Sequence, residues 1–207
     1  GYAQMYPPAS YYGAFIQQLN PADGTTIAKY GYTDGGTTNY GITNLSYLTV
    51  DSSGNLYGAG QDPNVYGVTV MKFNSSGSIL WQRLITNGTS PRYTLGQIAV
   101  DSSGNVYVGG GVNVLGSPFP VYPFVVKYNS SGTKQWMKAW TNSANNGFGN
   151  ARVAVSSGGT PYVVTARGGG TGLYFFTLNA STGAITAQAN FNNVAGQTPN
   201  PLAVDQS

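Results

Sequence analysis

The sequence contains no cysteine, no histidine and no glutamate, and its acidic residues are six aspartates. Disulfides and thiol chemistry are therefore excluded. Zinc and iron sites are excluded as well, because they depend on imidazole, thiolate and clustered carboxylate ligands. General acid–base catalysis most often uses histidine or glutamate, and a nucleophilic serine needs a basic partner. We therefore expect no catalytic residue, no metal and no cofactor in this chain.

Charge is also scarce. Charged residues make up 7% of the chain, against about 25% in an average globular protein. The nine lysines and arginines are scattered, whereas nucleic-acid binding needs a concentrated basic patch. No apolar run reaches the length of about 18 residues needed to span a membrane. Uncharged polar residues and 16 tyrosines favour an extracellular or virion surface, with no nucleic acid as partner and no membrane insertion.

What the sequence does contain is a repeat. One phrase occurs as LTVDSSGNLY (48–57), IAVDSSGNVY (98–107), VAVSSGGTPY (153–162) and LAVDQS (202–207). A second phrase alternates with it as FIQQLNPADGTTIA (15–28), VMKFNSSGSILW (70–81), VVKYNSSGTKQW (125–136) and FFTLNASTGAIT (175–186). A regular period of about 50 residues indicates a propeller, a solenoid or an array.

Each repeat predicts four short antiparallel strands. Residues such as YLTVD and VTVMKFN alternate or are rich in β-formers, and they flank the turns SSGN and SSGS. Aspartate or asparagine before the turn can accept bonds from backbone N–H groups ahead of it, and glycine supplies the left-handed conformation. No capped apolar pattern of helical period occurs, so we expect an all-β chain with essentially no helix. Four antiparallel strands in each unit favour a β-propeller.

The same residues carry a family resemblance. VDSSGNVYVGG followed by VVKYNSSGTKQW resembles the bacterial and phage β-propeller repeats that contain a D-x-x-G-N-x-Y hairpin. The K-[FY]-N-S-S-G-x-x-x-W segment is also similar to the tryptophan-docking repeat of quinoprotein-type propellers, without the acidic and cysteine residues of their cofactor pocket. The resemblance covers residues 14–207 and implies a propeller of four-stranded blades. Its implication for function is weaker, because such blades serve binding, scaffolding and catalysis.

We expect a single domain of four units, formed by residues 1–45 with 200–207, 46–95, 96–150 and 151–199. Tyr2 is expected at the second-strand position that Tyr57, Tyr107 and Tyr162 hold in the other units. Residues 202–207 would then pair with 1–5 and close a four-bladed ring. The alternative is that these four units form part of a larger ring completed by further sequence or by a second chain. The sequence leaves both open.

Several conspicuous residues have a structural interpretation. Asp51, Asp101 and Asp205 occupy one hairpin position, and Asp23 occupies a turn of the other hairpin, which leaves Asp34 and Asp62 on separate loops. Trp81 and Trp136 are expected to wedge between adjacent blades. Glycosylation is left open at five N-x-S/T sequons, namely Asn44, Asn74, Asn87, Asn129 and Asn179.

The two hairpin turns of each unit should emerge on one side of the ring, and the variable connections on the other. Those connections are rich in Tyr, Phe, Pro and Asn, which suits recognition from a rigid scaffold. The candidate ligand-binding residues are Tyr11, Tyr12, Tyr40, Tyr66, Tyr93, Phe119, Tyr122 and Phe148. We expect a non-catalytic module of a phage tail or fibre that contacts neighbouring subunits or a surface glycan or protein receptor. The alternatives are a secreted bacterial or archaeal adhesin or filament subunit, and a propeller enzyme with its catalytic groups outside this segment.

Overall fold

The computed structural model describes fifteen β-strands. The described residues are 2–5, 11–32, 45–62, 66–87, 92–113, 121–140, 149–167, 172–192 and 201–204, and the side chains of 2–5, 11–15, 31–32 and 62 are not part of the description. No helix occurs in these ranges, and no helix among them is therefore long and apolar enough to cross a membrane. The prediction of an all-β chain is confirmed.

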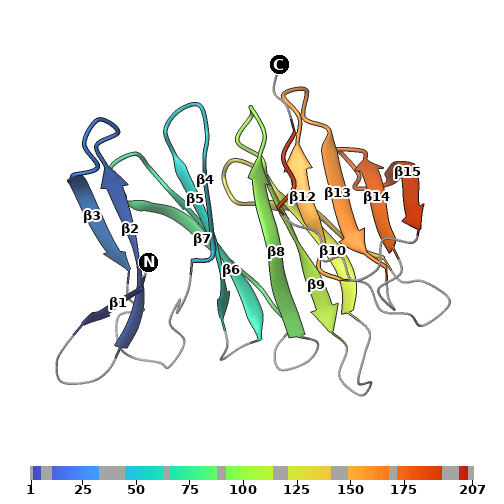
Figure 1. Cartoon of the computed structure of the whole chain (residues 1–207), viewed down its shortest axis with the longest axis horizontal. Helices are drawn as coiled ribbons and strands as arrows, with labels where there is room; N and C mark the ends of the chain where they lie inside the picture. Colours follow the sequence, from blue (N-terminus) through green and yellow to red (C-terminus); the bar gives the residue numbers. More distant parts are fainter. Residues whose placement is uncertain are drawn as a thin grey trace.

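The strands form four antiparallel sheets in chain order (Figure 1). The first sheet has three strands: β1 (Tyr2–Met5), β2 (Tyr11–Leu19) and β3 (Thr26–Tyr32). The second has four: β4 (Tyr47–Val50), β5 (Leu56–Asp62), β6 (Gly67–Phe73) and β7 (Ile79–Ile85). The third contains β8 (Arg92–Val100), β9 (Val106–Asn113), β10 (Val121–Tyr128) and β11 (Lys134–Ala139). The fourth contains β12 (Arg152–Val155), β13 (Pro161–Ala166), β14 (Gly172–Leu178) and β15 (Ile185–Asn192).

The predicted turn chemistry is present in the hairpins. Asp101 Oδ1 accepts bonds from the backbone N–H groups of Ser103 and Asn105, at 3.0 and 2.9 Å. Its Oδ2 accepts bonds from the Asn105 side chain and from the Tyr107 hydroxyl, and Gly104 has a φ of 75°. Asp51 repeats this arrangement in the second sheet. Burial alone would raise the pKa of the Asp51 carboxyl, but the hydrogen bonds from Asn55, Tyr57 and Ser53 outweigh it and lower that pKa.

Neighbouring sheets pack face to face through the tryptophans, as predicted. Trp81 of the second sheet is buried, and its Nε1 donates to the backbone oxygen of Ser130 in the β10–β11 turn of the third sheet, at 3.1 Å. Trp136 makes the equivalent bond to Ala180 in the β14–β15 turn of the fourth sheet, also at 3.1 Å. Lys127 donates to the same Ala180 oxygen at 2.9 Å. The repeat therefore creates a repeated junction between sheets.

Three tyrosines are buried between the sheets, and we expect their ionisation to lower the stability of the fold at alkaline pH. Burial raises the pKa of Tyr57 and Tyr107 well above the usual value, and it raises that of Tyr128 to about 12. In the unfolded chain these phenols would titrate near pH 10. Because folding raises their pKa, their contribution to stability is complete below pH ~10 and is lost as the pH rises from there towards the folded values.

We expect the urea midpoint of unfolding to fall progressively above pH ~10, as measured by circular dichroism. Tyr128→Phe keeps the buried ring and removes one ionising group, so its alkaline decline should be shallower. Titration of all tyrosines near pH 10 in a protein that stays folded, followed by phenolate absorbance, would contradict the expectation.

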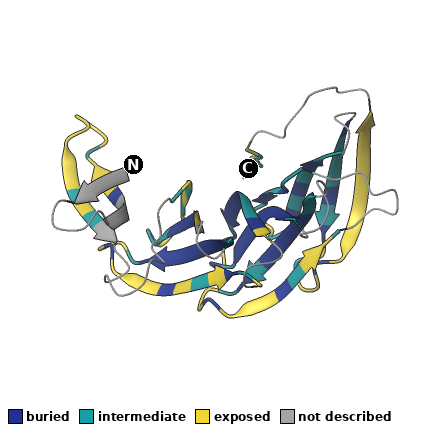
Figure 2. Cartoon of the chain, turned by 90° about the horizontal axis from the view of Figure 1, so that it is seen from below, coloured by how far each residue is buried: buried dark blue, intermediate teal, exposed yellow. Residues whose placement is uncertain are grey.

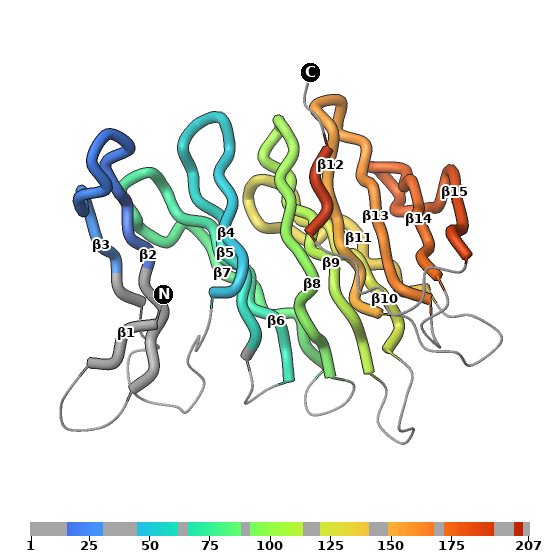
Figure 3. The backbone as a smooth tube through the Cα atoms, in the orientation of Figure 1, coloured from blue at the N-terminus to red at the C-terminus, as the bar shows by residue number. Residues whose placement is uncertain are grey.

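The four sheets form an open arc and not a closed four-bladed ring (Figure 2). Residues 202–207 were expected to pair with 1–5, but β1 is paired with β2 alone among the described residues. Residues 201–204 lie instead beside β8 (Figure 3). There the Gln97 side chain bonds both backbone groups of Leu202, at 2.7 Å to its oxygen and 2.8 Å to its nitrogen. The closure expectation is not met by the described part of this chain.

The expected position of Tyr2 is also wrong. Tyr57, Tyr107 and Tyr162 lie opposite Lys72, Lys127 and Thr177, whose equivalent in the first sheet is Gln18. Tyr2 instead lies opposite Ala14, which is four residues from Gln18. The pairing of β1 and β2 begins with Met5 opposite Tyr11. The expected register, with Tyr2 opposite Gln18, would need a longer connection between the two strands, and closing a longer connection costs more entropy.

Candidate functional site

The two ends of the strands differ in the way that the repeat predicts. The β2–β3, β4–β5, β8–β9 and β12–β13 turns lie along one side of the arc, and the strands leading into the variable connections end along the other side (Figure 1). We call the first side the turn end and the second side the loop end. Among the described residues, the loop end of the second and third sheets carries three tyrosines and an arginine, namely Tyr66, Arg92, Tyr93 and Tyr122, and we call this set the aromatic cluster.

Tyr66 is held in an unusual conformation. Its φ of 48° makes it the one non-glycine residue with positive φ in the described ranges, and bulky side chains rarely adopt this region. The Arg92 guanidinium lies over the Tyr66 ring, with its central carbon 3.9 Å from the ring centroid. The backbone N–H of Tyr93 donates to the Tyr66 oxygen at 2.8 Å. The start of β8 therefore fixes the residue that precedes β6.

Tyr93 and Tyr122 extend this group across the third sheet. Both lie opposite Val112, Tyr93 in β8 and Tyr122 in β10, so the three form one cross-strand row. Tyr93 is buried, and its ring meets Phe124 edge to face with centroids 5.4 Å apart. Burial raises the pKa of its hydroxyl. Tyr122 is partly buried and packs against the core between the second and third sheets.

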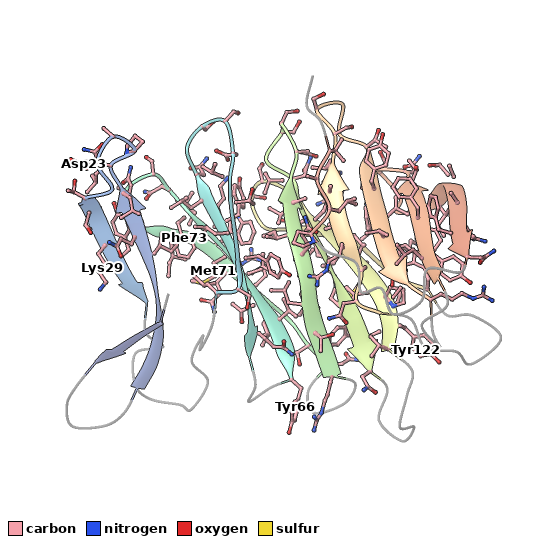
Figure 4. All side chains as sticks on the ribbon, viewed as in Figure 1. Asp23, Lys29, Tyr66, Met71, Phe73 and Tyr122 are labelled. Atoms are coloured by element: carbon pink, nitrogen blue, oxygen red, sulfur yellow. The ribbon has the colours of Figure 1, made fainter. Side chains whose placement is uncertain are left out.

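Three of the eight candidate residues thus lie in the described part of the loop end. Tyr66 is bonded to Tyr93 through the backbone, and Tyr122 lies two strands from Tyr93 in the third sheet. Figure 4 shows Tyr66 and Tyr122 towards the loop end, apart from one another. Tyr66 and Tyr122 retain partial exposure, whereas the Tyr93 ring is buried against Phe124. Tyr11 and Tyr12 lie in β2, with side chains outside the description. Tyr40, Phe119 and Phe148 lie outside the described residues.

A second polar group, which the sequence reasoning missed, lines the first strands of three sheets. Arg152 of β12 donates from Nη1 to the Tyr47 hydroxyl of β4 and to the Gly96 backbone oxygen of β8. The Thr94 hydroxyl donates to Asn150 Oδ1 at 2.8 Å. The sequence did contain a sign of this group, because polar residues stand at the start of first strands that are otherwise apolar. Nothing in the sequence, however, shows that these strands face one another.

Neither group has the composition of a catalytic or metal centre. The described residues contain no cluster of three aspartates or other metal-ligating side chains. In the same part of the chain, every buried side-chain nitrogen or oxygen has a hydrogen-bond partner. Asp23, Asp51 and Asp101 are engaged in their own turns. What the two groups offer is hydrogen bonding and aromatic stacking.

Comparison with known proteins gives the fold and no function. No protein-family model matches the chain, and no curated protein matches it. Among solved structures, it is similar to a protein of unknown function from Bacteroides caccae, with a TM-score of 0.51 and 16% sequence identity. The match covers 87% of this chain and 55% of that chain, so the present chain spans about half of the length of its structural neighbour.

Proposed function

We propose that the four sheets are blades of a β-propeller, and that the chain is a non-catalytic recognition module in which the loop end contacts the ligand. The observation that carries the proposal is the aromatic cluster, in which Tyr66 is held by the Arg92 guanidinium and by the Tyr93 backbone. A partly exposed tyrosine fixed in advance loses little entropy on binding. Its ring and the neighbouring guanidinium suit the apolar face and the hydroxyl groups of a sugar, or a polar peptide.

A recognition role agrees with the distribution of residue types. The turn end is built from short, repeated hairpins whose aspartates and asparagines bond to their own backbone. Sequence variation is concentrated at the loop end. Because a rigid scaffold with variable loops is a common arrangement for binding proteins, the loop end is the better candidate surface. The inner polar group of Arg152 and Tyr47 uses its donors within the fold.

The setting that we propose is a virion or cell surface, with a phage tail or fibre favoured. The support is the low content of charge and the resemblance of the repeat to phage and bacterial propellers. A secreted adhesin or filament subunit would use the same surface in another setting, and the neighbouring genes distinguish the two. Capsid and tail genes support the first, and secretion genes support the second.

The aromatic cluster is tested by removing its two partly exposed rings together. Tyr66→Asn introduces a residue that tolerates positive φ, and Tyr122→Thr introduces a β-branched residue that suits a strand. We expect the double variant to lose at least about tenfold in binding on a glycan array or in adsorption to host cells, with an unchanged circular dichroism spectrum.

Leu80→Ala is the matched control, because Leu80 is an exposed apolar residue at the start of β7, towards the turn end. It should bind as the unsubstituted chain does. Full binding by a folded double variant would refute the proposed binding surface and would leave an architectural role.

A further inference from the structure

The repeat defines two faces on every sheet. We call the face turned towards the following sheet the forward face, and the opposite one the backward face. Tyr57 and Ile85 lie on the forward face of the second sheet and are buried against the third. Trp140 follows the last strand of the third sheet and stacks on Phe176 of the fourth, with centroids 5.8 Å apart. Each internal junction thus joins a forward face to a backward face.

The forward face of the fourth sheet carries apolar residues at the corresponding positions, with Ala187 in place of the tryptophan, and among the described residues they are left exposed or only partly buried. Tyr162 is the counterpart of Tyr57 and Tyr107, which are fully buried, yet it is only partly buried. Phe175 stacks on Tyr162, with centroids 5.9 Å apart. Phe191, opposite Leu173 in β14, is the counterpart of Ile85, opposite Val68 in β6. Phe191 is 54% exposed and Ile85 is 5% exposed.

The backward face of the first sheet shows the complementary difference. Leu19 corresponds to Phe73, Tyr128 and Leu178, as the register shift at this position in β2, β6, β10 and β14 shows. The three counterparts are buried, whereas Leu19 is 52% exposed. The surroundings of the turn glycines also show that the backward face of the first sheet is uncovered. Side-chain atoms from the preceding sheet lie against Gly77, Gly132 and Gly183, but no described atom lies within 4 Å of a Cβ built on Gly24.

The two uncovered faces lie at opposite ends of the arc, where Figure 2 shows exposed residues on β15 and on the first sheet. Their apolar residues stand at positions that the other sheets bury in each other. A further sheet of the same repeat therefore fits each end. Since one end presents a forward face and the other a backward face, the surface that fits each of them is present at the opposite end of an identical chain.

We propose that a second copy of this chain completes the ring, with the forward face of each fourth sheet packed against the backward face of the partner's first sheet. Head-to-tail contacts of this kind close into a ring when the rotation allows it. Two copies contribute eight sheets, within the usual range of about four to eight blades, whereas three copies would exceed it. The inference rests on the proposed blade arrangement and not on the proposed ligand.

The test uses one substitution at each end. Phe191→Asp places a charge on the forward face, and Leu19→Asp places one on the backward face. Both residues are exposed in the isolated chain, so both variants should fold normally by circular dichroism. Light scattering coupled to size exclusion should give a dimer for the unsubstituted chain. We expect each variant to weaken the dimer on the order of 100-fold, because a charge is buried without a partner.

Leu84→Asp is the matched control, since Leu84 is 46% exposed but lies within the arc on β7; it should leave the dimer intact. Mixing the Phe191→Asp and Leu19→Asp variants should restore part of the dimer, because one of the two junctions then has both original residues.

A monomer, a trimer or an open filament of the unsubstituted chain would overturn the proposal. A dimer that neither end substitution weakens would also overturn it. A dimer that binds no ligand would contradict the proposed binding surface and leave the proposed ring intact. The two proposals can therefore be refuted separately.

Discussion

Replacing Trp81 by alanine is expected to lower the free energy of unfolding by about 3–5 kcal/mol, the range for a large buried aromatic residue. The ring lies between Tyr57 and Tyr128, each with its centroid 6.3 Å away. Its Nε1 donates to the Ser130 oxygen across the junction. Alanine would lose the ring contacts, leave a cavity between the second and third sheets, and deprive the Ser130 oxygen of this bond. Urea unfolding followed by fluorescence and circular dichroism measures the loss.

Two controls separate the contributions. Trp81→Phe retains an aromatic ring and loses the Nε1 bond, so it should cost clearly less than alanine. Trp136→Ala should cost about as much as Trp81→Ala, because Trp136 makes the equivalent bond to Ala180 and packs beside Tyr107. A loss below about 1.5 kcal/mol for both alanine variants would show that the tryptophans do not hold the sheets together.

The turn glycines provide the second large effect. Gly132 has a φ of 79°, and a Cβ added there would lie 2.8 Å from a ring atom of Trp81. Gly132→Ala therefore combines two costs. The left-handed backbone is unfavourable for alanine by about 1–2 kcal/mol, and the displacement of the tryptophan adds a further ~1–3 kcal/mol of overpacking. We expect the free energy of unfolding to fall by about 2–5 kcal/mol in total.

Gly24→Ala is the matched control for this substitution. Its φ of 72° gives the same backbone cost, but no described atom lies within 4 Å of the added Cβ. We therefore expect a loss of only about 1–2 kcal/mol, measured by the same urea unfolding. Equal losses at Gly24 and Gly132 would mean that the turn glycines matter for their backbone conformation alone, and that the contact between sheets contributes nothing.

Local structure was predictable because it depends on neighbouring residues. Aspartate or asparagine followed by glycine determines a hairpin through bonds that span four residues or fewer, so the turns at Asp51 and Asp101 are confirmed. The position of Trp81 and Trp136 between neighbouring sheets is confirmed as well. It was predictable because a large apolar residue on the last strand of a sheet can be buried only against the neighbouring sheet. Both features follow from short sequence patterns and from burial.

The register of β1 and the course of residues 201–204 were not predictable in this way. The prediction for Tyr2 was based on the number of residues between Tyr2 and Leu19, and it did not consider the length of the connection between β1 and β2. In the structure the two strands pair from Met5 and Tyr11 onwards, so this connection is short. The repeat also assigned residues 202–207 to a first strand, but in the described chain the Gln97 side chain binds Leu202. Tyr93 was a candidate binding residue, and its burial against Phe124 depends on the pairing of three strands. These outcomes depend on contacts between distant residues.

The bonds donated by Trp81 and Trp136 end on backbone oxygens and not on side chains. The residue that supplies this oxygen is a serine at position 130 and an alanine at position 180. A main-chain acceptor is present whichever amino acid occupies the site, so these turns are free to diverge during evolution while the attachment persists. A copy of a unit that carries the tryptophan therefore finds its acceptor in the next turn without a matched side chain there, which lowers the number of changes that a gene duplication requires.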